Sequence, residues 1–151
     1  MNNLKSQCRI AVVQAAPILF DRAGPTKKAV ELIRTAADQG AELVVLPELY
    51  IPGYPYGMTF GFTVGARNEA GRKDWKRYYD NSILVPGEET AALAAVAGEL
   101  GIYVSIGVSE RDPFTATLYN TNLIFSPDGK LDSVHRKLKP TGAERLVWGD
   151  A

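Results

Sequence analysis

The chain has 151 residues and a mass of 16.4 kDa, which is about the size of one ordinary domain. Its 17 basic and 17 acidic residues cancel, so it lacks the positive excess of a general nucleic-acid binder or a polybasic membrane-surface protein. One cysteine, Cys8, and one histidine, His135, exclude an internal disulfide and a structural zinc site made of Cys and His ligands.

An apolar strand is predicted near the start of the chain, over Ile10–Ala16, where Gln14 is the polar exception. Gln14 interrupts the stretch too early for it to serve as the apolar core of a signal peptide. The longest apolar run elsewhere, Ala91–Ala97, is far shorter than the roughly 20 residues that span a membrane. We therefore expect a cytoplasmic protein without a membrane segment.

A helix and a second strand are predicted next. Gly24 and Pro25 are typical of a helix start, apolar residues recur at helical spacing after them, and Gly40 predicts the helix end. Leu43–Leu46 is a continuous apolar stretch that Pro47 ends, because proline cannot donate to the ladder of a central strand. A strand in which apolar and polar residues do not alternate is typical of a sheet that is buried on both faces, as in α/β proteins.

Residues 50–86 form a long segment rich in aromatic residues, glycine and proline, which a charged helix around Glu69–Tyr79 interrupts. Insertions of this kind after a strand end often carry function. The alternative is a surface loop with a small hydrophobic cluster of its own, and the pattern by itself leaves both interpretations open.

The remaining elements complete an α/β chain. The pattern predicts a helix over Glu88–Gly101, a third strand over Ile102–Ser109 and a fourth over Leu118–Ser126. The turn residues at 126–129 then predict a fifth strand, Leu131–Leu138, antiparallel to the fourth. There is no internal repeat or linker, and the fold class is α/β with mixed strand pairing.

Three ionisable residues lie next to predicted strand ends, where ligands bind in open α/β sheets. Glu48 follows the second strand, Lys137 lies near the end of the fifth, and Glu144 comes shortly after it. Each also has a simpler interpretation as a solvated surface charge, and the spacing does not decide between the two. We interpret His135 as a strand residue rather than a catalyst.

Several short motifs occur in an order that resembles the nitrilase family of carbon–nitrogen hydrolases. They are Val-Val-Leu-Pro-Glu ending at Glu48, Pro-Gly-Tyr-Pro from Pro52, Tyr-Asn-Thr from Tyr119, His-Arg-Lys-Leu-Lys-Pro-Thr from His135, and Glu-Arg-Leu-Val-Trp-Gly-Asp from Glu144. The resemblance covers the chain from about Arg9 onward. The motif that begins at His135 is similar to the true nitrilase branch rather than to the amidase or carbamoylase branches.

The resemblance implies roles for single residues. Glu48 matches the catalytic glutamate of the family, Lys137 its catalytic lysine, and Glu144 its second, assisting glutamate. The aromatic segment is the expected wall of the substrate pocket, with Tyr54 and Phe60 as its substrate-binding residues. Neither a metal nor an organic cofactor is implied.

The third member of the family's triad is a cysteine nucleophile that follows the segment matching Trp148–Asp150. We therefore expect this chain to lack the nucleophile, to be inactive, and to be poorly stable or self-associating by itself. Cys8 is not expected to replace the nucleophile, because it precedes the first strand at the other end of the chain.

The implied fold is the nitrilase-like four-layer α-β-β-α sandwich, of which residues 1–151 would be an incomplete, N-terminal part of a single domain with roughly half of both sheets. The implied reaction converts a nitrile to a carboxylate and ammonia through a Cys thioimidate. The alternatives are a fragment of an amidase-branch enzyme and a non-catalytic copy that binds intact subunits. The expected partners are a small nitrile or amide and further copies in a homo-oligomer or spiral, with no nucleic acid and no membrane.

Overall fold

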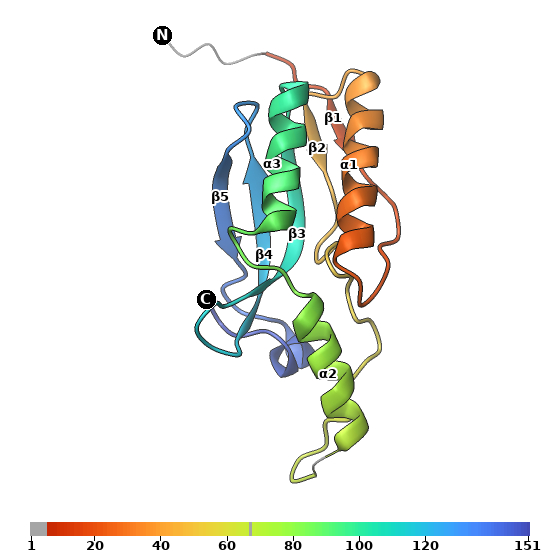
Figure 1. The fold of residues 1–151 in the computed structure, drawn as a ribbon, viewed down its shortest axis with the longest axis vertical. Coiled ribbons are helices and arrows are strands. Elements are labelled where there is room, and N and C mark those ends of the chain that lie inside the picture. Colours follow the sequence, from red (N-terminus) through yellow and green to blue (C-terminus); the bar gives the residue numbers. More distant parts are fainter. Residues whose placement is uncertain (1–5, 67) are drawn as a thin grey trace.

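The structure is a computed structural model that describes residues 6–66 and 68–151. Its elements are, in chain order, β1 (Ile10–Val12), α1 (Ala23–Asp38), β2 (Leu43–Val45), α2 (Glu69–Asn81), α3 (Glu88–Leu100), β3 (Tyr103–Arg111), β4 (Leu118–Phe125), β5 (Leu131–Arg136) and a 3-10 helix, η1 (Gly142–Leu146). The described residues form one five-stranded sheet in the order β1-β2-β3-β4-β5 (Figure 1). The α/β class predicted from the sequence is confirmed.

The sheet has mixed strand directions, as predicted. β1, β2 and β3 are parallel neighbours, whereas β4 is antiparallel to both β3 and β5. The predicted turn joins β4 to β5, with Gly129 N donating to Ser126 O at 3.0 Å. Gly129 has a φ of 72°, which glycine adopts without strain because it has no Cβ.

Two predicted strands are longer than those observed. β1 ends at Val12 instead of Ala16: Val13 N still donates to Val45 O at 2.8 Å, and Pro47, which ends the predicted second strand, follows shortly after β2. β5 ends at Arg136 instead of Leu138. Lys137 therefore directly follows the last strand instead of lying inside it.

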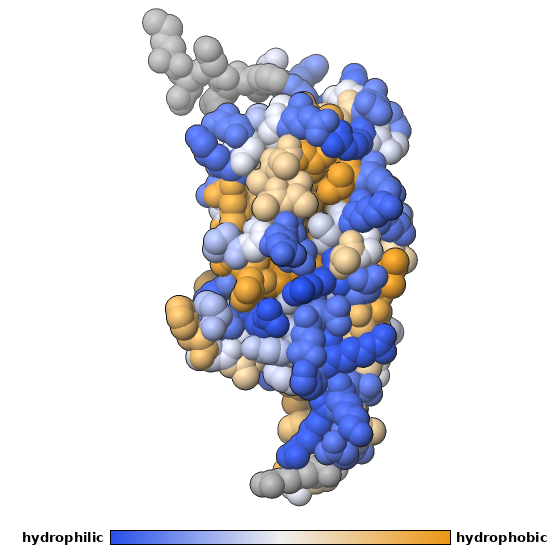
Figure 2. All heavy atoms as spheres, in the orientation of Figure 1, coloured by the Kyte–Doolittle hydropathy of each residue, from blue (hydrophilic) through white to orange (hydrophobic). Residues whose placement is uncertain are grey.

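Two helices, α1 and α3, pack side by side on one face of the sheet, which we call the helix face (Figure 1). The buried core lies between these helices and the strands and includes Ala29, Ile33, Val44, Leu93, Val96, Ile106, Val108, Leu123 and Phe125. Figure 2 views the molecule from this side and shows hydrophilic residues over the outer surface of α1 and over α2. No helix within the described ranges is both long and apolar enough to cross a membrane.

The other face of the sheet, which we call the open face, is covered by neither α1 nor α3. Apolar side chains on its parallel strands remain exposed: Ile10 by 53%, Val12 by 78% and Tyr103 by 47%. The expectation of roughly half of both sheets is wrong for the described residues. β4 and β5 extend the edge of β3 instead of starting a second sheet, so the chain contributes one sheet and one helix layer.

The aromatic segment and α2 build a smaller hydrophobic cluster below the sheet in Figure 1. We call it the aromatic cluster, and its buried members are Leu49, Tyr78, Leu118 and Trp148. Tyr78 is fully buried, and its hydroxyl donates to the backbone oxygen of Gly53 at 2.9 Å. The segment thus has a hydrophobic cluster of its own, and this cluster begins one residue after Glu48.

Candidate active site

Glu48 lies in a short bulge that the chain makes after β2. The residues on either side of the bulge bond the same residue of β3: Gly107 N donates to Pro47 O at 3.2 Å, and Tyr50 N donates to Gly107 O at 2.8 Å. Two residues, Glu48 and Leu49, therefore lie opposite Gly107, where a regular parallel ladder has one. Bulges re-aim side chains and are frequent next to active sites. This bulge brings the Glu48 side chain to the open face.

Gly107 permits the bulge because it has no side chain. A Cβ at this position would lie 2.5 Å from Leu49 N and 2.6 Å from Glu48 Cα, and these backbone atoms cannot move aside easily. Leu49 has a φ of 49°, a left-handed conformation that costs a non-glycine residue roughly 1–3 kcal/mol. Its fully buried side chain, packed in the aromatic cluster, holds it there. Packing around the bulge therefore sets the position of Glu48.

Asn120 and Lys137 come from neighbouring strands. Asn120 is in β4 and Lys137 follows β5, and Lys137 N donates to Asn120 O at 2.7 Å, which continues the ladder. Successive residues of a strand point to opposite faces of the sheet. Asn120 and Lys137 consequently point to the open face, whereas their neighbours Thr121 and Arg136 point to the helix face.

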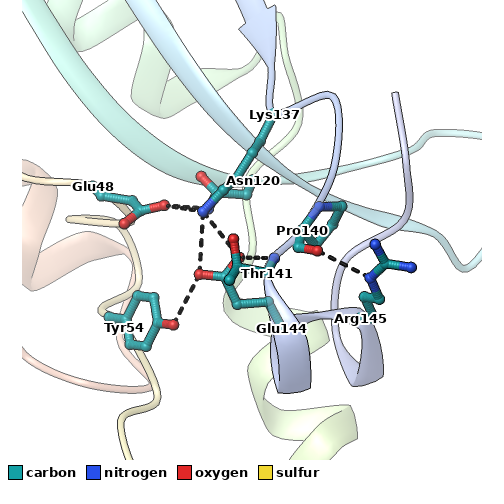
Figure 3. Close-up of polar contacts among 8 residues, drawn as sticks. All are labelled: Glu48, Tyr54, Asn120, Lys137, Pro140, Thr141, Glu144 and Arg145. Atoms are coloured by element: carbon teal, nitrogen blue, oxygen red, sulfur yellow. Dashed lines mark hydrogen bonds and ion pairs between the residues drawn. The ribbon is translucent and has the colours of Figure 1, made fainter.

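The side chains converge on one ammonium group (Figure 3). Lys137 Nζ lies 3.0 Å from Glu48 Oε1 and 2.9 Å from Glu144 Oε2. Asn120 Nδ2 donates to the same Glu48 oxygen, Oε1, at 2.6 Å. The other oxygen, Glu48 Oε2, points away from Lys137 in Figure 3 and accepts no hydrogen bond from residues 6–66 and 68–151.

Glu144 lies in η1 and is surrounded by donors. Thr141 N donates to its Oε2 at 2.7 Å in the manner of a capping box. Tyr54 donates its hydroxyl hydrogen to Oε1 at 3.0 Å, and Lys137 Nζ contacts both oxygens. Because both oxygens have partners, Glu144 is a fixed anchor for the ammonium group.

These contacts shift the ionisation of the site. The hydrogen bond with Glu144 raises the pKa of Lys137; burial opposes this shift, and the hydrogen bond with Glu48 adds to it. Burial by itself would raise the pKa of Glu144, but hydrogen bonds from Thr141, Lys137 and Tyr54 outweigh it and hold that pKa below its ordinary value. Burial raises the pKa of Tyr54, and its bond to Glu144 adds to this effect. At neutral pH the site therefore contains the ammonium form of Lys137, the carboxylate form of Glu144 and the phenol form of Tyr54.

The site is open to solvent on one side and packed on the other. The side chain of Glu48 is 50% exposed, that of Lys137 is 32% exposed, and that of Glu144 is 10% exposed. A pocket of about 280 Å³ lies next to Glu144. Its wall is mostly apolar and aromatic and includes Tyr54, Pro55, Tyr56, Met58, Val147 and Trp148.

A second ion pair lies directly behind the first, on the helix face. Glu110 of β3 is 3% exposed, and its Oε2 accepts hydrogen bonds from Thr121 Oγ1 at 2.7 Å and from Arg136 Nε at 3.0 Å. Its Oε1 accepts from Arg136 Nη2 at 2.5 Å. This pair ties β3, β4 and β5 together behind Asn120 and Lys137.

Four of the five side chains predicted for the site contact one another: Glu48, Tyr54, Lys137 and Glu144. Phe60 is not in contact with this group. Its ring packs against the Tyr78 ring, with 6.0 Å between the centroids, and it lines a separate pocket of about 200 Å³. A substrate-binding role for Phe60 stays a prediction.

The single cysteine and the single histidine both lie outside the cluster of contacts. Cys8 is exposed and precedes β1, whereas Glu48 follows the parallel strand β2, so the two residues lie at opposite ends of the strands. His135 is an exposed residue of β5, as predicted, and its side chain makes no hydrogen bond within the part of the chain that the structure describes. Among those same residues, no three His, Cys, Asp or Glu side chains are arranged to hold a metal ion.

Sequence reasoning assigned no site role to three contributors, Gly107, Asn120 and Trp148, although Asn120 and Trp148 lie in two of the quoted motifs. Trp148 Nε1 donates to Ser109 Oγ at 3.0 Å, and its ring lies beside that of Tyr54 with 5.9 Å between the centroids. For Asn120 there was a signal, because an amide within the apolar pattern of a central strand needs a polar partner when it is buried.

Comparison with known proteins finds relatives in the same family that the sequence motifs resemble. The sequence model of a family described as carbon-nitrogen hydrolase matches residues 9–150. The chain is 52% identical over 141 residues to an aliphatic nitrilase of Sinorhizobium fredii (strain HH103), an alignment that spans 93% of this chain and 45% of that protein. It is 45% identical over 141 residues to nitrilase 2 of Arabidopsis thaliana, with 93% and 41% of the two chains covered.

Solved structures also resemble the chain. Nit3 of Saccharomyces cerevisiae, a member of branch 10 of the nitrilase superfamily, superposes with a TM-score of 0.70 at 26% identity, over 94% of this chain and 48% of that one. An amidase from Nesterenkonia sp. shares the fold at 18% identity, with a TM-score of 0.67 over 95% of this chain and 48% of that one. The chain thus spans about half the length of the relatives that it matches.

Proposed function

Since the chain belongs to the carbon–nitrogen hydrolase family, we propose that it forms the part of a nitrilase-type active site that holds the base and the cation. The complete site would convert a nitrile to a carboxylate and ammonia. The observation that carries this proposal is the Lys137 ammonium group between Glu48 and Glu144, at 3.0 and 2.9 Å, with one Glu48 oxygen left open.

Lys137 is the proposed electrostatic catalyst. Attack of a thiolate on the nitrile carbon forms a carbon–sulfur bond and places negative charge on the nitrile nitrogen. An ammonium group that is already in position stabilises this charge as it develops. Glu144 supports this role, because its hydrogen bond raises the pKa of Lys137 and keeps the amine protonated.

Glu48 is the proposed general base. Its open oxygen accepts the proton of the attacking thiol, and the nitrile nitrogen is protonated to give a thioimidate. One water molecule then converts the thioimidate to a thioester and releases ammonia, and a second releases the carboxylate and restores the thiol. Glu48 passes the thiol proton to the nitrile nitrogen. It then takes one proton from each water in turn, giving the first to the leaving nitrogen and the second to the leaving sulfur. The half-exposed side chain supports this role, because water and the thiol must both reach it.

The thiol itself is proposed to come from the further half of the protein that the relatives have and residues 1–151 do not span. Cys8 is a poor candidate, because it lies at the opposite end of the parallel strands from Glu48. A free thiol nucleophile favours a reducing compartment, which supports a cytoplasmic location. Exposed apolar residues on the open face, such as Val12, support assembly with further polypeptide, including other copies.

The proposed substrates are small nitriles, with amides as the alternative. The pocket beside Glu144 supports an apolar substituent, because Tyr54, Val147 and Trp148 line it. Comparing the rates on a nitrile and on the matching amide separates the two reactions.

The test is a fusion of residues 1–151 with the part of the Sinorhizobium aliphatic nitrilase that follows its matching segment. We expect the fusion to release ammonia and carboxylate from an aliphatic nitrile. Glu48→Gln should lower kcat/KM about a hundred- to ten-thousandfold. Lys137→Met should lower it about a hundred- to a thousandfold.

The matched control is Lys139→Met. Lys139 is two residues from Lys137, is 68% exposed and pairs with Asp150, so its loss should leave the rate within about twofold. A Glu48→Gln fusion as active as its parent would overturn the proposal. A fusion that unfolds cooperatively but releases no ammonia would also count against it.

A further inference from the structure

We propose that Asn120 is a positioning residue for Glu48: its amide holds one carboxylate oxygen against Lys137 so that the other oxygen is the one that takes the proton. This inference rests on the proposed function, because it concerns the orientation of the proposed general base. Asn120 itself would touch neither the substrate nor the reacting atoms.

The two carboxylate oxygens of Glu48 differ in their hydrogen-bond donors. Asn120 Nδ2 donates to Oε1 at 2.6 Å, and Lys137 Nζ contacts the same oxygen at 3.0 Å. No donor in the described residues reaches Oε2. Both donors thus act on one oxygen, and the lone pairs of the other stay available.

A carboxylate in this setting needs a second donor to keep one orientation. The torsion that turns a glutamate carboxylate has a broad, roughly twofold profile, so the side chain does not fix it intrinsically. Packing does not fix it either, since the Glu48 side chain is 50% exposed. Lys137 alone cannot fix it, because an ammonium group is a compact charge on a flexible stem that attracts either oxygen. The directional amide of Asn120 removes this ambiguity.

Asn120 is rigid enough for this role. It is 5% exposed, and β4 pairs with a strand on each side of it. Its backbone oxygen accepts the Lys137 N–H at 2.7 Å. This bond fixes the backbones of Asn120 and Lys137, the two donors to Glu48, relative to each other. On the helix face, the neighbouring Thr121 bonds Glu110, which fixes the strand from behind.

Glu144 provides the contrast. Its Oε2 accepts from Thr141 N and Lys137, and its Oε1 accepts from Tyr54 and Lys137. A carboxylate with donors on both oxygens anchors a cation but has little capacity to take a further proton. The difference between one occupied oxygen and two is what assigns the base role to Glu48.

The test compares Asn120→Leu with Asn122→Leu in the 151-residue chain and in the nitrilase fusion. Asn122 is on the same strand and face, and its Oδ1 accepts from Ser105 Oγ at 3.2 Å, away from Glu48; its side chain makes no other hydrogen bond within the described residues. Both variants lose one amide and keep a similar volume. Asn120→Asp is the third variant, because it keeps the shape, removes the donor and replaces it with a carboxylate oxygen that repels Glu48.

The first readout is the pKa of Lys137, measured by NMR titration of its side chain in the 151-residue chain. If Asn120 holds Glu48 against Lys137, Asn120→Leu should lower this pKa, because Glu48 contributes to raising it. Asn122→Leu should leave it unchanged. A purely structural role for Asn120 would not move this value in a variant that still unfolds cooperatively.

The second readout is the rate of the fusion. We expect Asn120→Leu and Asn120→Asp to lower kcat roughly ten- to a hundredfold with KM within about twofold, because a misplaced base slows the chemical steps. Asn122→Leu should stay within about twofold of the parent in both constants.

An unchanged pKa of Lys137 in Asn120→Leu, or a fully active Asn120→Asp, would overturn the inference. Failure of the proposed function looks different: Glu48→Gln would then retain activity, whatever Asn120→Leu does to the titration of Lys137. If Asn120→Leu fails to fold, Asn120→Asp supplies the kinetic result and Asn122→Leu the control.

Discussion

Two glutamate–cation pairs lie back to back on the two faces of the same strands. On the helix face, Glu110 has donors on both oxygens, from Arg136 and Thr121, and is 3% exposed. On the open face, Glu48 has donors on one oxygen only, and its side chain is 50% exposed. The cations are consecutive residues, Arg136 and Lys137, that alternate across the sheet.

The two pairs contain the same kinds of charged group, so burial and the number of donors, and not the residue types, distinguish the structural pair from the one proposed to be reactive. A buried carboxylate with every oxygen occupied contributes a constraint between strands. A half-exposed carboxylate with a free oxygen can exchange a proton with a substrate or with water. We call Glu110–Arg136 the closed pair and Glu48–Lys137 the open pair. The closed pair connects the strands next to which Asn120 and Lys137 lie.

The largest expected loss of stability comes from removing the cation of the Glu110–Arg136 pair. Arg136→Met leaves the Glu110 carboxylate buried without its cation, so the free energy of unfolding should fall by about 3 kcal/mol or more in urea denaturation followed by circular dichroism. Lys137→Met is the control and should cost about 1 kcal/mol or less, because Glu48 is 50% exposed and Glu144 keeps its hydrogen bonds from Tyr54 and Thr141. Equal losses in the two variants would break the comparison.

The next effect tests the backbone that supports the open pair. Gly107→Ala introduces a Cβ about 2.5 Å from Leu49 N, so the bulge that carries Glu48 must shift. We expect a loss of roughly 2–3 kcal/mol in the same denaturation measurement, typical of overpacking against atoms that cannot yield.

Gly57→Ala is its control. A Cβ there meets no atom within 4 Å, although its φ is 75°, so only the strain of the left-handed backbone, roughly 1–2 kcal/mol, should appear. If Gly107→Ala costs no more than this, contact between β3 and the bulge does not set the position of Glu48.

A smaller loss of stability is expected when one of the hydrogen-bond donors to Glu144 is removed. Tyr54→Phe removes one hydrogen bond and leaves the ring, so the free energy of unfolding should fall by about 1 kcal/mol. The matched control is Tyr56→Phe, at a residue that is 90% exposed, and it should change nothing measurable. A loss above about 3 kcal/mol for Tyr54→Phe would mean that Glu144 is as completely desolvated and as dependent on its donors as Glu110.

The smallest expected effect is a dependence of stability on pH. The pKa of Glu144 is lower in the folded chain than in the unfolded one, so its stabilising contribution is complete above its ordinary pKa of about 4.3 and is lost as the pH falls through the folded value. The pKa of Lys137 is raised, so its contribution is complete below its ordinary value of about 10.4 and is lost as the pH rises through the folded value.

Glu144→Gln isolates the acidic half of this prediction. The difference in unfolding free energy between parent and variant should be present at pH 6–7, shrink below about pH 4, and stay near 1 kcal/mol or less, since the site is partly solvated. A difference that grows as the pH falls would contradict the lowered pKa of Glu144.

Much of the fold could be predicted from the sequence. The spacing of apolar residues located α1 and α3, and the turn at residues 126–129 predicted the antiparallel pairing of β4 and β5, because these are local properties of the chain. The length of β1 and the number of sheets could not be predicted in this way. Both depend on which strands pair with one another, as β1 does with β2 and β4 with β3, and the local spacing of residues does not specify this pairing.

The sequence by itself determined that Glu48, Lys137 and Glu144 stand beside strand ends in the motif order of a carbon–nitrogen hydrolase. Only the tertiary structure decided which oxygen of Glu48 is occupied, because its donor Asn120 is 72 residues away in the chain. That contact requires the register of three strands and a bulge that Gly107 permits. Spacing along the chain specifies which chemical groups are available, whereas the distances and free lone pairs between them follow from strand register and packing.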